Sequence, residues 1–533
     1  MVTNIFEKNK SRSISSVIDR LNYAADIVEF LSDVKLDNGK SISENLTIDG
    51  IFFWEIFAAE LAHIHIPQVF LSNSLNENIW HGIKSELIKV KYGLGNFFQN
   101  KYSTEGCQNW PNEDTILGLA FTNRMYVDIL HPLMDHLVSR KVASVTVLED
   151  RKLPALCGLP VENAVHQNLW QHWANDMKGD VSKLNIAIKQ LKVHLELPGI
   201  LSNILAEEHQ YLLSNFKELF NRFFNAYMPL AVPYVIVARH ILTKHRPSVV
   251  LTTDTADSRT RIFTSLCSNM GIPCIDIQFG LAGDEAVEWR FLLADYVAVW
   301  GDSSKEAILN QKVRLDRIKL TGSPRHDLLI NKDICNLYSE RMQLGIPETS
   351  AVILLASTYH FKSTNHVDVN ILHSMQSAIS NAAVKTPGIT LIVKPHPHED
   401  VRETRKFFSN CSSIIFADKN SDIKNLIRLC DAFVSYGSTA TIDALIAGKL
   451  SICPIFPGWI FSSDIFKESG ATLVPETSEE IDDIFESISN GMYLKTKESL
   501  EVARQKFIHR YVYKPDGHAS SRIAAVISEM MGV

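Results

Sequence analysis

The chain has 533 residues, of which 46% are hydrophobic and 21% charged, as in an ordinary globular protein long enough for two or three domains. A net charge of −7 gives no overall attraction to nucleic acid, so we expect no nucleic-acid partner. The eight cysteines are scattered without a C-x-x-C pair, which argues against a disulfide framework and a zinc site and for a reducing compartment.

The first residues lack the apolar core of a secretory signal, so we expect a cytoplasmic protein. Two apolar stretches, Ile51 to Ile66 and Tyr227 to Ile241, are interrupted by charges or prolines and fall short of the ~20 apolar residues of a membrane span. Both are predicted to be core helices. The aromatic stretch Phe220 to Val237 keeps peripheral association with the inner face of the membrane as an alternative.

The amino-terminal part is predicted to be mainly helical. Apolar residues at helical spacing mark Ser15 to Leu36, Ile51 to Ala62, Ile79 to Val90, Val181 to Leu195 and Ser202 to Phe224. Val142 to Leu148 is the first convincing strand, and the whole of Glu162 to His245 reads as helical. This long helical region is a candidate surface for an acceptor or a partner.

From Pro247 the pattern changes to short strands alternating with helices. Val249 to Thr253, Asp257 to Met270 and Cys274 to Gln278 form a strand, a helix and a strand, which is the parallel crossover unit. Further strands are predicted at Tyr296 to Val299 and Ile318 to Leu320, and a domain boundary near residues 331–336.

Three strands in the second half end at polar residues. The strand Val352 to Ala356 ends at Ser357 and Thr358; Gly388 to Val393 ends at Lys394, His396 and Pro397; and Ala432 to Ser435 ends at Gly437, Ser438 and Thr439. The helix Ala440 to Ala447 follows the last of these and stops at Gly448.

Ligands of open α/β sheets bind outside the carboxyl ends of strands, so these loops are candidates for one site. His396 could bind a phosphate or a ribose, and the hydroxyls of Ser438 and Thr439 at a helix start could bind an anion. Asp443, one turn into the helix, could accept from a ribose hydroxyl. The alternatives are that His396 only ends a strand and that the hydroxyls are an ordinary helix cap.

A family resemblance rests on a set of motifs: Lys394-Pro395-His396-Pro397, Gly437-Ser438-Thr439, Asp443 to Lys449, Ala294 to Gly301, Thr321 to Asp327 and Asp516 to Ala524. In this order they resemble bacterial surface-polysaccharide glycosyltransferases of GT-B architecture, and most of all the capsule Kdo transferases and other enzymes with a His-Pro motif that use CMP-activated sugars. The resemblance covers about Pro247 to Val533.

The resemblance implies an α/β protein of GT-B architecture, with two Rossmann-like domains facing a cleft and a large helical amino-terminal region. The expected domains are an acceptor-side domain at 1–335, a nucleotide-sugar-binding domain at 336–510 and a carboxyl-terminal helix at 511–533 that can cross back to the first domain. It also implies that Ser357 and Thr358 approach the donor phosphates.

The expected activity is transfer of a sugar, such as Kdo or a sialic-acid-like ulosonic acid, from a CMP donor to a glycan or glycoconjugate acceptor. Alternatives are a transferase that uses a UDP-sugar or CDP-glycerol, a sugar-nucleotide 2-epimerase, and a non-catalytic scaffold. Neither a cofactor nor a metal is expected, because no Asp-x-Asp stands at a strand end.

A general base is needed if the acceptor hydroxyl must lose its proton. Many relatives carry Gln-His-Gly where this chain has Gln278-Phe279-Gly280, so that histidine is missing and a carboxylate must serve. The candidates are Asp254, Asp284 and Glu285, each of which could equally be a cap or part of a surface ion pair. Together with His396 they complete the predicted catalytic set.

Overall fold

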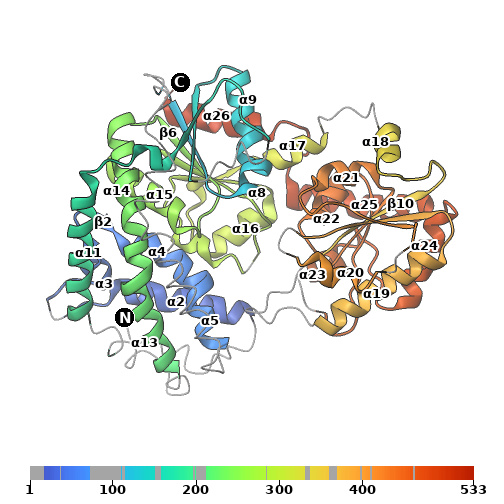
Figure 1. Ribbon diagram of the computed structural model, residues 1–533, viewed down its shortest axis with the longest axis horizontal. Coiled ribbons are helices and arrows are strands. Elements are labelled where there is room, and N and C mark those ends of the chain that lie inside the picture. The colour runs from blue at the N-terminus through green and yellow to red at the C-terminus, as the bar shows by residue number, and fades with distance from the viewer. Residues whose placement is uncertain are drawn as a thin grey trace. The chain divides into compact units, whose positions relative to one another are not determined.

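The computed structural model describes residues 17–36, 38–71, 110, 115–150, 158–195, 199, 212–283, 285–330, 337–358, 369–396, 399–408, 411–459 and 463–532. The chain divides into two compact units. Unit 1 consists of Met1–Thr321 and Ser520–Val533, and unit 2 of Gly322–Ala519 (Figure 1). The carboxyl-terminal segment therefore belongs to unit 1, and the domain limits expected from the sequence stay a prediction.

Unit 1 is built on a parallel sheet of seven strands in the order β5-β4-β3-β6-β7-β8-β9. The strands are β3 (Thr115–Ala120), β4 (Ser144–Glu149), β5 (Val165–Asn168), β6 (Val249–Thr252), β7 (Cys274–Ile277), β8 (Tyr296–Val299) and β9 (Ile318–Leu320). A two-stranded hairpin, β1 (Thr47–Ile48) and β2 (Ile51–Phe52), lies outside this sheet. The order of the strands reverses between β3 and β6.

Helices cover both faces of this sheet. They are α2 (Val17–Asp33), α3 (Ile42–Asn45), α4 (Phe53–Glu60), η1 (Leu61–His65), α5 (Ile66–Leu71), α8 (Asn123–Met125), η2 (Tyr126–Leu130), α9 (His131–Ser139), η3 (Leu169–His172), α11 (Met177–His194), α13 (Leu213–Arg222), η5 (Phe223–Tyr227), α14 (Met228–His245), α15 (Ser258–Met270), η6 (Val287–Phe291), α16 (Asp302–Asn310), η7 (Leu315–Arg317) and α26 (Ala519–Met531). Residues alternate along β3, so Leu117 and Leu119 pack with α4, α14 and α15, whereas Ile116 packs with α9 and with Ile523 of α26.

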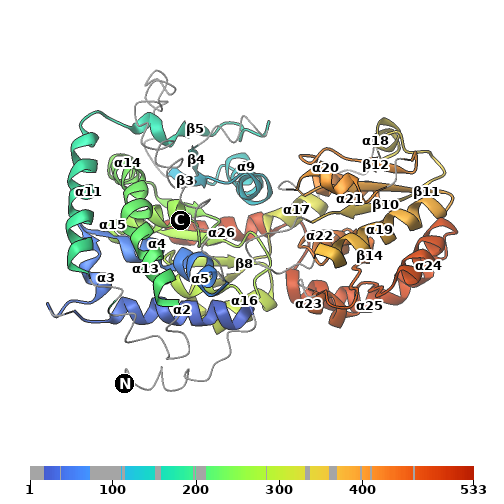
Figure 2. The same cartoon turned by 60° about the horizontal axis from the view of Figure 1, so that its bottom comes forward.

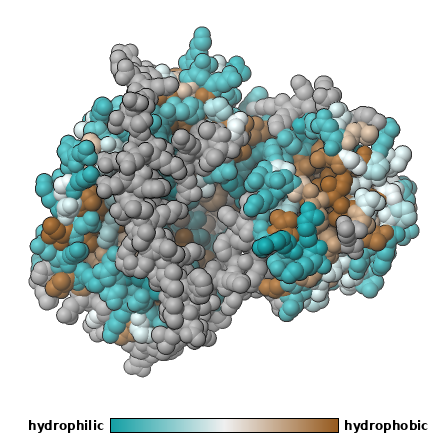
Figure 3. Space-filling view, viewed as in Figure 1, coloured by the Kyte–Doolittle hydropathy of each residue, from teal (hydrophilic) through white to brown (hydrophobic). Residues whose placement is uncertain are grey.

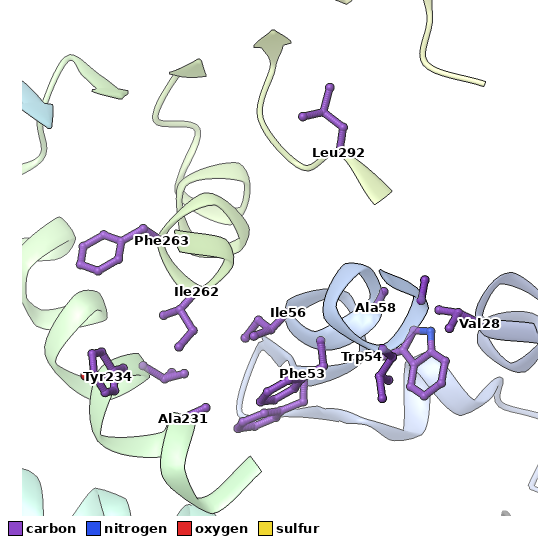
Figure 4. Packing of buried hydrophobic residues seen from close by; sticks show 14 of the residues in the cluster. Val28, Phe53, Trp54, Ile56, Ala58, Ala231, Tyr234, Ile262, Phe263 and Leu292 are labelled. Atoms are coloured by element: carbon purple, nitrogen blue, oxygen red, sulfur yellow. The ribbon is translucent and has the colours of Figure 1, made fainter. Parts of the chain in front are cut away.

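The amino-terminal helices are part of the core of unit 1. Phe53 and Ile56 of α4 are fully buried and point toward α14 and α15, where Ala231 and Ile262 lie opposite them (Figure 4). Arg261 of α15 is also buried, and its guanidinium donates to backbone carbonyl groups, including that of Ile56 at 3.0 Å. The helical region is thus fixed to the sheet by packing and by hydrogen bonds.

Unit 2 contains a parallel sheet of five strands in the order β12-β11-β10-β13-β14. The strands are β10 (Ala351–Ala356), β11 (Ile389–Lys394), β12 (Ile414–Phe416), β13 (Ala432–Ser435) and β14 (Leu450–Ile452). The helices are α17 (Pro324–Ile330), α18 (Leu337–Gln343), α19 (Val369–Lys385), α20 (Val401–Arg405), α21 (Ile423–Leu429), α22 (Ala440–Ile446), α23 (Ser463–Ser469), α24 (Ser478–Ser489) and α25 (Tyr493–Val512). Ile353 and Leu355 pack toward α19 and α24, and Val352 and Leu354 toward α21, so each face of the sheet is covered (Figure 2).

The predicted α/β fold with parallel sheets and a large helical region is confirmed, and two sequence-based assignments are wrong. β3 precedes the strand predicted to be the first, and β5 lies inside a stretch predicted to be entirely helical. β5 has the sequence VHQN, which carries no apolar run, and it forms because it pairs with β4 at the edge of the sheet. The predicted helix Ile79 to Val90 lies outside the described residues.

One continuous helical segment, Leu213–His245, is long and apolar enough to cross a bilayer by length and composition, and 61% of its most apolar window is buried within the protein. Such burial is typical of a core helix. Figure 3 shows that hydrophobic residues on the visible face of unit 2 form patches among hydrophilic ones. Membrane association stays a prediction.

Candidate functional site

Three of the predicted loops lie at one edge of the unit 2 sheet. β10 pairs in parallel with β11 on one side and with β13 on the other, so the loops after these strands leave the same edge. The order of the strands reverses between β10 and β13, and crevices at such reversals bind ligands in open α/β sheets. The His396 loop and the Ser438 loop are therefore separated by one strand, and the loop of Ser357 and Thr358 lies between them.

Glu399 joins the ends of β10 and β11. Its Oε1 accepts a hydrogen bond from Ser357 Oγ at 2.8 Å, and its Oε2 accepts from the backbone N–H of His396 at 2.8 Å. Thr404 Oγ1 donates to the same carboxylate. Burial raises the pKa of Glu399 although these hydrogen bonds act in the opposite direction. Sequence reasoning missed this connection, because it joins side chains at the ends of two strands and no local pattern indicates it.

The loop after β13 lies close to the same carboxylate. Burial, and then the charge of Glu399, raise the pKa of Tyr436 well above its usual value. Gly437 has a φ of 87°, a conformation that favours glycine, and it turns the chain toward Ser438. The hydroxyl oxygen of Ser438 is buried and has no hydrogen-bond partner among the described residues. Buried hydroxyls are normally paired, so this one is available to a ligand atom.

The alternative that Thr439 is an ordinary side-chain cap of α22 is not seen in the structure, and its predicted contact with an anion stays a prediction. Its backbone is helical, and its side chain makes no capping hydrogen bond. Instead, Ser435 Oγ accepts from the backbone N–H groups of Gly437 and Ser438 at 3.3 and 3.4 Å. The hydroxyl of Ser435 thus fixes the turn between β13 and α22, before the helix begins at Ala440.

Two residues of the predicted donor site are buried for structural reasons. Lys394 is 6% exposed, and its ammonium donates to the carbonyl groups of Pro395 and Lys419 at 2.9 and 2.7 Å. Asp443 is fully buried, and both its oxygens accept from Arg325 of α17. Both charges are thus engaged inside unit 2, and the predicted contacts of Lys394 with a donor and of Asp443 with a ribose stay predictions.

The remaining predicted residues of unit 2 are placed as follows. His396 is half-buried directly after β11, with its backbone carbonyl accepting from Glu399 N at 2.9 Å. Thr358 is half-buried after β10. Pro397 lies outside the described residues.

Acidic residues gather at the corresponding edge of the unit 1 sheet. Asp254 follows β6, and its Oδ1 accepts from the backbone N–H groups of Ala256 and Asp257 at 2.9 and 3.1 Å. Burial, and then the charge of Asp257, raise the pKa of Asp254 to about 7. A carboxyl with this pKa can exchange a proton near neutral pH, which is the property of a general base.

Glu285 and a histidine lie near Asp254. The charges of Asp254 and Glu285 both act on His63, a residue of the amino-terminal helical region that sequence reasoning missed. Nothing in the local sequence relates His63 to β6, because it comes from a distant helix. Asp284 lies outside the described residues. Gln278 is buried, and its Oε1 accepts from the backbone N–H of Trp300 at 2.8 Å.

No group of three or more His, Cys, Asp or Glu side chains placed to hold a metal ion occurs in the described part of the chain.

Comparison with known proteins adds a family match. Residues 281–449 match the family described as CDP-Glycerol:Poly(glycerophosphate) glycerophosphotransferase. This stretch contains the His396 loop and the Ser438 loop. No curated protein matches.

Solved structures resemble both units. The S. aureus MnaA–UDP structure is 14% identical, with 79% of this chain and 97% of that chain covered and a TM-score of 0.52. The wall teichoic acid polymerase TagF, as a variant, is 11% identical, with 86% and 99% covered and a TM-score of 0.51. The UDP-GlcNAc 2-epimerase from Neisseria meningitidis bound to UDP-GlcNAc is 14% identical, with 78% and 100% covered and a TM-score of 0.50.

These similarities confirm the fold, and with the family match over residues 281–449 they indicate an enzyme of the glycosyltransferase type. They do not support the specific resemblance to CMP-dependent Kdo transferases. The matched family uses CDP-glycerol, which was one of the alternatives from the sequence.

Proposed function

We propose that the protein transfers glycerol phosphate from CDP-glycerol to a hydroxyl group of a surface polymer, with release of CMP. The observation that carries this proposal is the family match over residues 281–449, because it includes the loops of His396 and Ser438. The similarity in fold to TagF over 86% of the chain is consistent with it. Donor binding is assigned to residues 336–510 and acceptor binding to residues 1–335, in the cytoplasm.

In this reaction the acceptor oxygen bonds to the phosphorus next to glycerol, and the bond from that phosphorus to the CMP oxygen breaks. Negative charge develops on the phosphate of the departing CMP. His396 at the end of β11 and the hydroxyl of Ser438 after β13 would stabilise this charge. Glu399 supports the proposal, because it fixes the backbone at His396 relative to Ser357.

The proton of the acceptor hydroxyl needs a base. Asp254 suits this role, because its pKa of about 7 leaves a large fraction of the carboxyl ionised at neutral pH. Glu285, near the same edge, is the second carboxylate proposed, and Asp284 stays a prediction from the sequence.

A CMP-linked ulosonic acid is the second candidate donor. It is favoured by Lys394-Pro395-His396 and Gly437-Ser438-Thr439, which resemble the motifs of CMP-sugar enzymes. Both donors release CMP, so the same phosphate-stabilising residues would serve either reaction.

Nucleotide release distinguishes the candidates. The protein is incubated separately with CDP-glycerol, CMP-Kdo and UDP-GlcNAc, with and without a glycerol phosphate oligomer, and the products are separated by chromatography. The proposal expects CMP from CDP-glycerol only when the oligomer is present. CMP from CMP-Kdo alone favours the second donor, and conversion of UDP-GlcNAc without acceptor indicates an epimerase. Absence of binding to CMP, CDP and UDP by calorimetry would leave only the scaffold alternative.

A further inference from the structure

The loop after β13 carries two buried hydroxyl groups, those of Tyr436 and Ser438. Tyr436 is 2% exposed, and neither its Oη nor the Oγ of Ser438 has a hydrogen-bond partner among the described residues. Buried tyrosine hydroxyls usually have a partner, because a buried polar group without one destabilises the fold. Each of these two O–H groups can instead donate to an atom of a ligand.

The other hydroxyls of the same turn are already paired. Ser435 Oγ accepts from the backbone N–H groups of Gly437 and Ser438. It also lies 2.6 Å from Thr441 Oγ1, which in turn lies 3.9 Å from Cys453 Sγ. These contacts hold the backbone between β13 and α22, so the hydroxyls of Tyr436 and Ser438 belong to a turn of fixed shape.

Glu399, the charged neighbour of Tyr436, does not accept from its hydroxyl. The carboxylate accepts from Ser357 Oγ and from the backbone N–H of His396, both at 2.8 Å, and also from Thr404 Oγ1. Three donors from the loops after β10 and β11 thus bind Glu399, and Tyr436 Oη makes no hydrogen bond with it.

Packing sets the position of the Tyr436 ring. The ring belongs to the core cluster that also contains Ile353 and Leu355 of β10, and its centroid lies 6.0 Å from that of Trp459, after β14. A phenylalanine could keep this packing and would lack only the hydroxyl. The role of the hydroxyl can therefore be tested separately from that of the ring.

The position of the turn and the chemistry of the two groups favour a phosphate as their partner. The turn follows β13, at the reversal of strand order where open α/β sheets bind ligands. An O–H donor gains most from a charged acceptor, because such hydrogen bonds are about twice as strong as neutral ones. The phosphates are the charged acceptors of a donor nucleotide.

We propose that Tyr436, together with Ser438, donates a hydrogen bond to the diphosphate of the donor nucleotide. This inference rests on the proposed function and adds Tyr436 to its donor site. CDP-glycerol carries two phosphate groups, so the two hydroxyls can bind different ones. All the protein groups involved belong to unit 2.

Calorimetry on the full chain with CDP and with cytidine tests the proposal, because CDP carries the diphosphate and cytidine lacks it. The variants are Tyr436→Phe and Ser438→Ala. The matched control is Tyr511→Phe in α25, where the ring stacks on Phe507 with the centroids 4.3 Å apart. We expect Tyr436→Phe and Ser438→Ala each to weaken CDP binding by about tenfold or more and to leave cytidine affinity unchanged. Tyr511→Phe should bind both ligands as the wild type does.

The melting temperature without ligand separates a ligand-binding hydroxyl from a structural one. Thr441 is fully buried, and Thr441→Val should lower Tm because Ser435 loses its partner. Tyr436→Phe should keep the Tm of the wild type or raise it, because no hydrogen bond within the protein is lost.

Three results would overturn the inference. They are a CDP affinity of Tyr436→Phe within about twofold of that of Tyr511→Phe, a loss of cytidine affinity as large as that for CDP, and a fall in Tm as large as that of Thr441→Val. The last result would mean that the hydroxyl is already paired, for example with a buried water molecule. Each leaves the proposed function intact if the wild type releases CMP from CDP-glycerol. Failure of the wild type both to bind CDP and to release CMP overturns the proposed function, and the inference with it.

Discussion

Asp443→Asn is expected to destabilise unit 2 strongly, because it leaves the buried guanidinium of Arg325 without its counter-charge. Asp443 is fully buried and Arg325 is 1% exposed, and the guanidinium donates to the carboxylate through Nε at 2.9 Å. Breaking a buried ion pair by removing one partner costs about 3–5 kcal/mol. For a unit of about 200 residues this lowers Tm by roughly 6–20 °C. Differential scanning calorimetry, with hydrogen exchange in α22 to identify the unit, measures the change.

Two further variants show whether the buried charge is the cause. Asp482→Asn removes the partner of Lys385, whose side chain is 65% exposed, and should cost less than about 1 kcal/mol. Replacing both members of the buried pair, Arg325→Met with Asp443→Leu, should recover most of the loss, because no charge is then left unpaired. A cost for Asp443→Asn as small as that for Asp482→Asn would refute the reasoning.

Three other predictions concern separate parts of the chain. Burial raises the pKa of Asp254 to about 7, above that of an unfolded carboxyl, so the unfolded state ionises first and the free energy of unfolding should fall as pH rises from about 4 to about 7. Asp254→Asn should therefore raise the free energy of unfolding at pH 8 by roughly 1–4 kcal/mol and have little effect at pH 4, as measured by urea unfolding at both pH values. A Cβ atom at Gly118 would lie 2.4 Å from Met134 Sδ, so Gly118→Ala should cost about 1–3 kcal/mol, whereas Gly179→Ala, in an open helical position, should stabilise by about 0.5–1 kcal/mol in the same assay. His396→Ala should lower the rate of CMP release by at least ~10²-fold without a change in Tm, and a rate near that of the wild type would contradict its role.

The sequence predicts most strands after Pro247, because buried parallel strands are short apolar runs bounded by breakers, but it missed the short strands β12 and β14. β8, β9 and β13 have the predicted bounds, and β6, β7 and β10 differ by one residue at one end. β5 could not be found this way, because its formation depends on pairing with β4 and not on its own residues.

The sequence predicted which loops follow the strands, but not which of their polar side chains are buried and paired inside the protein. His396 and Ser438 have the expected loop positions because they follow apolar strands. Lys394 and Asp443 are equally polar in the sequence, yet both are turned inward, because their partners come from other loops and helices. The contact of His63 with Glu288 joins elements far apart in the chain, and no local pattern indicates it.

The position of α26 has a consequence for biosynthesis. Ile523 and Ile527 are fully buried against the same sheet face as α9, although the whole of unit 2 separates them from the rest of unit 1 in the sequence. Unit 2 is continuous and has all its strands before α26 is synthesised. We therefore expect unit 2 to reach its native state on the ribosome before α26 joins unit 1, so that the sheet face beside α9 is completed only after α26 is synthesised.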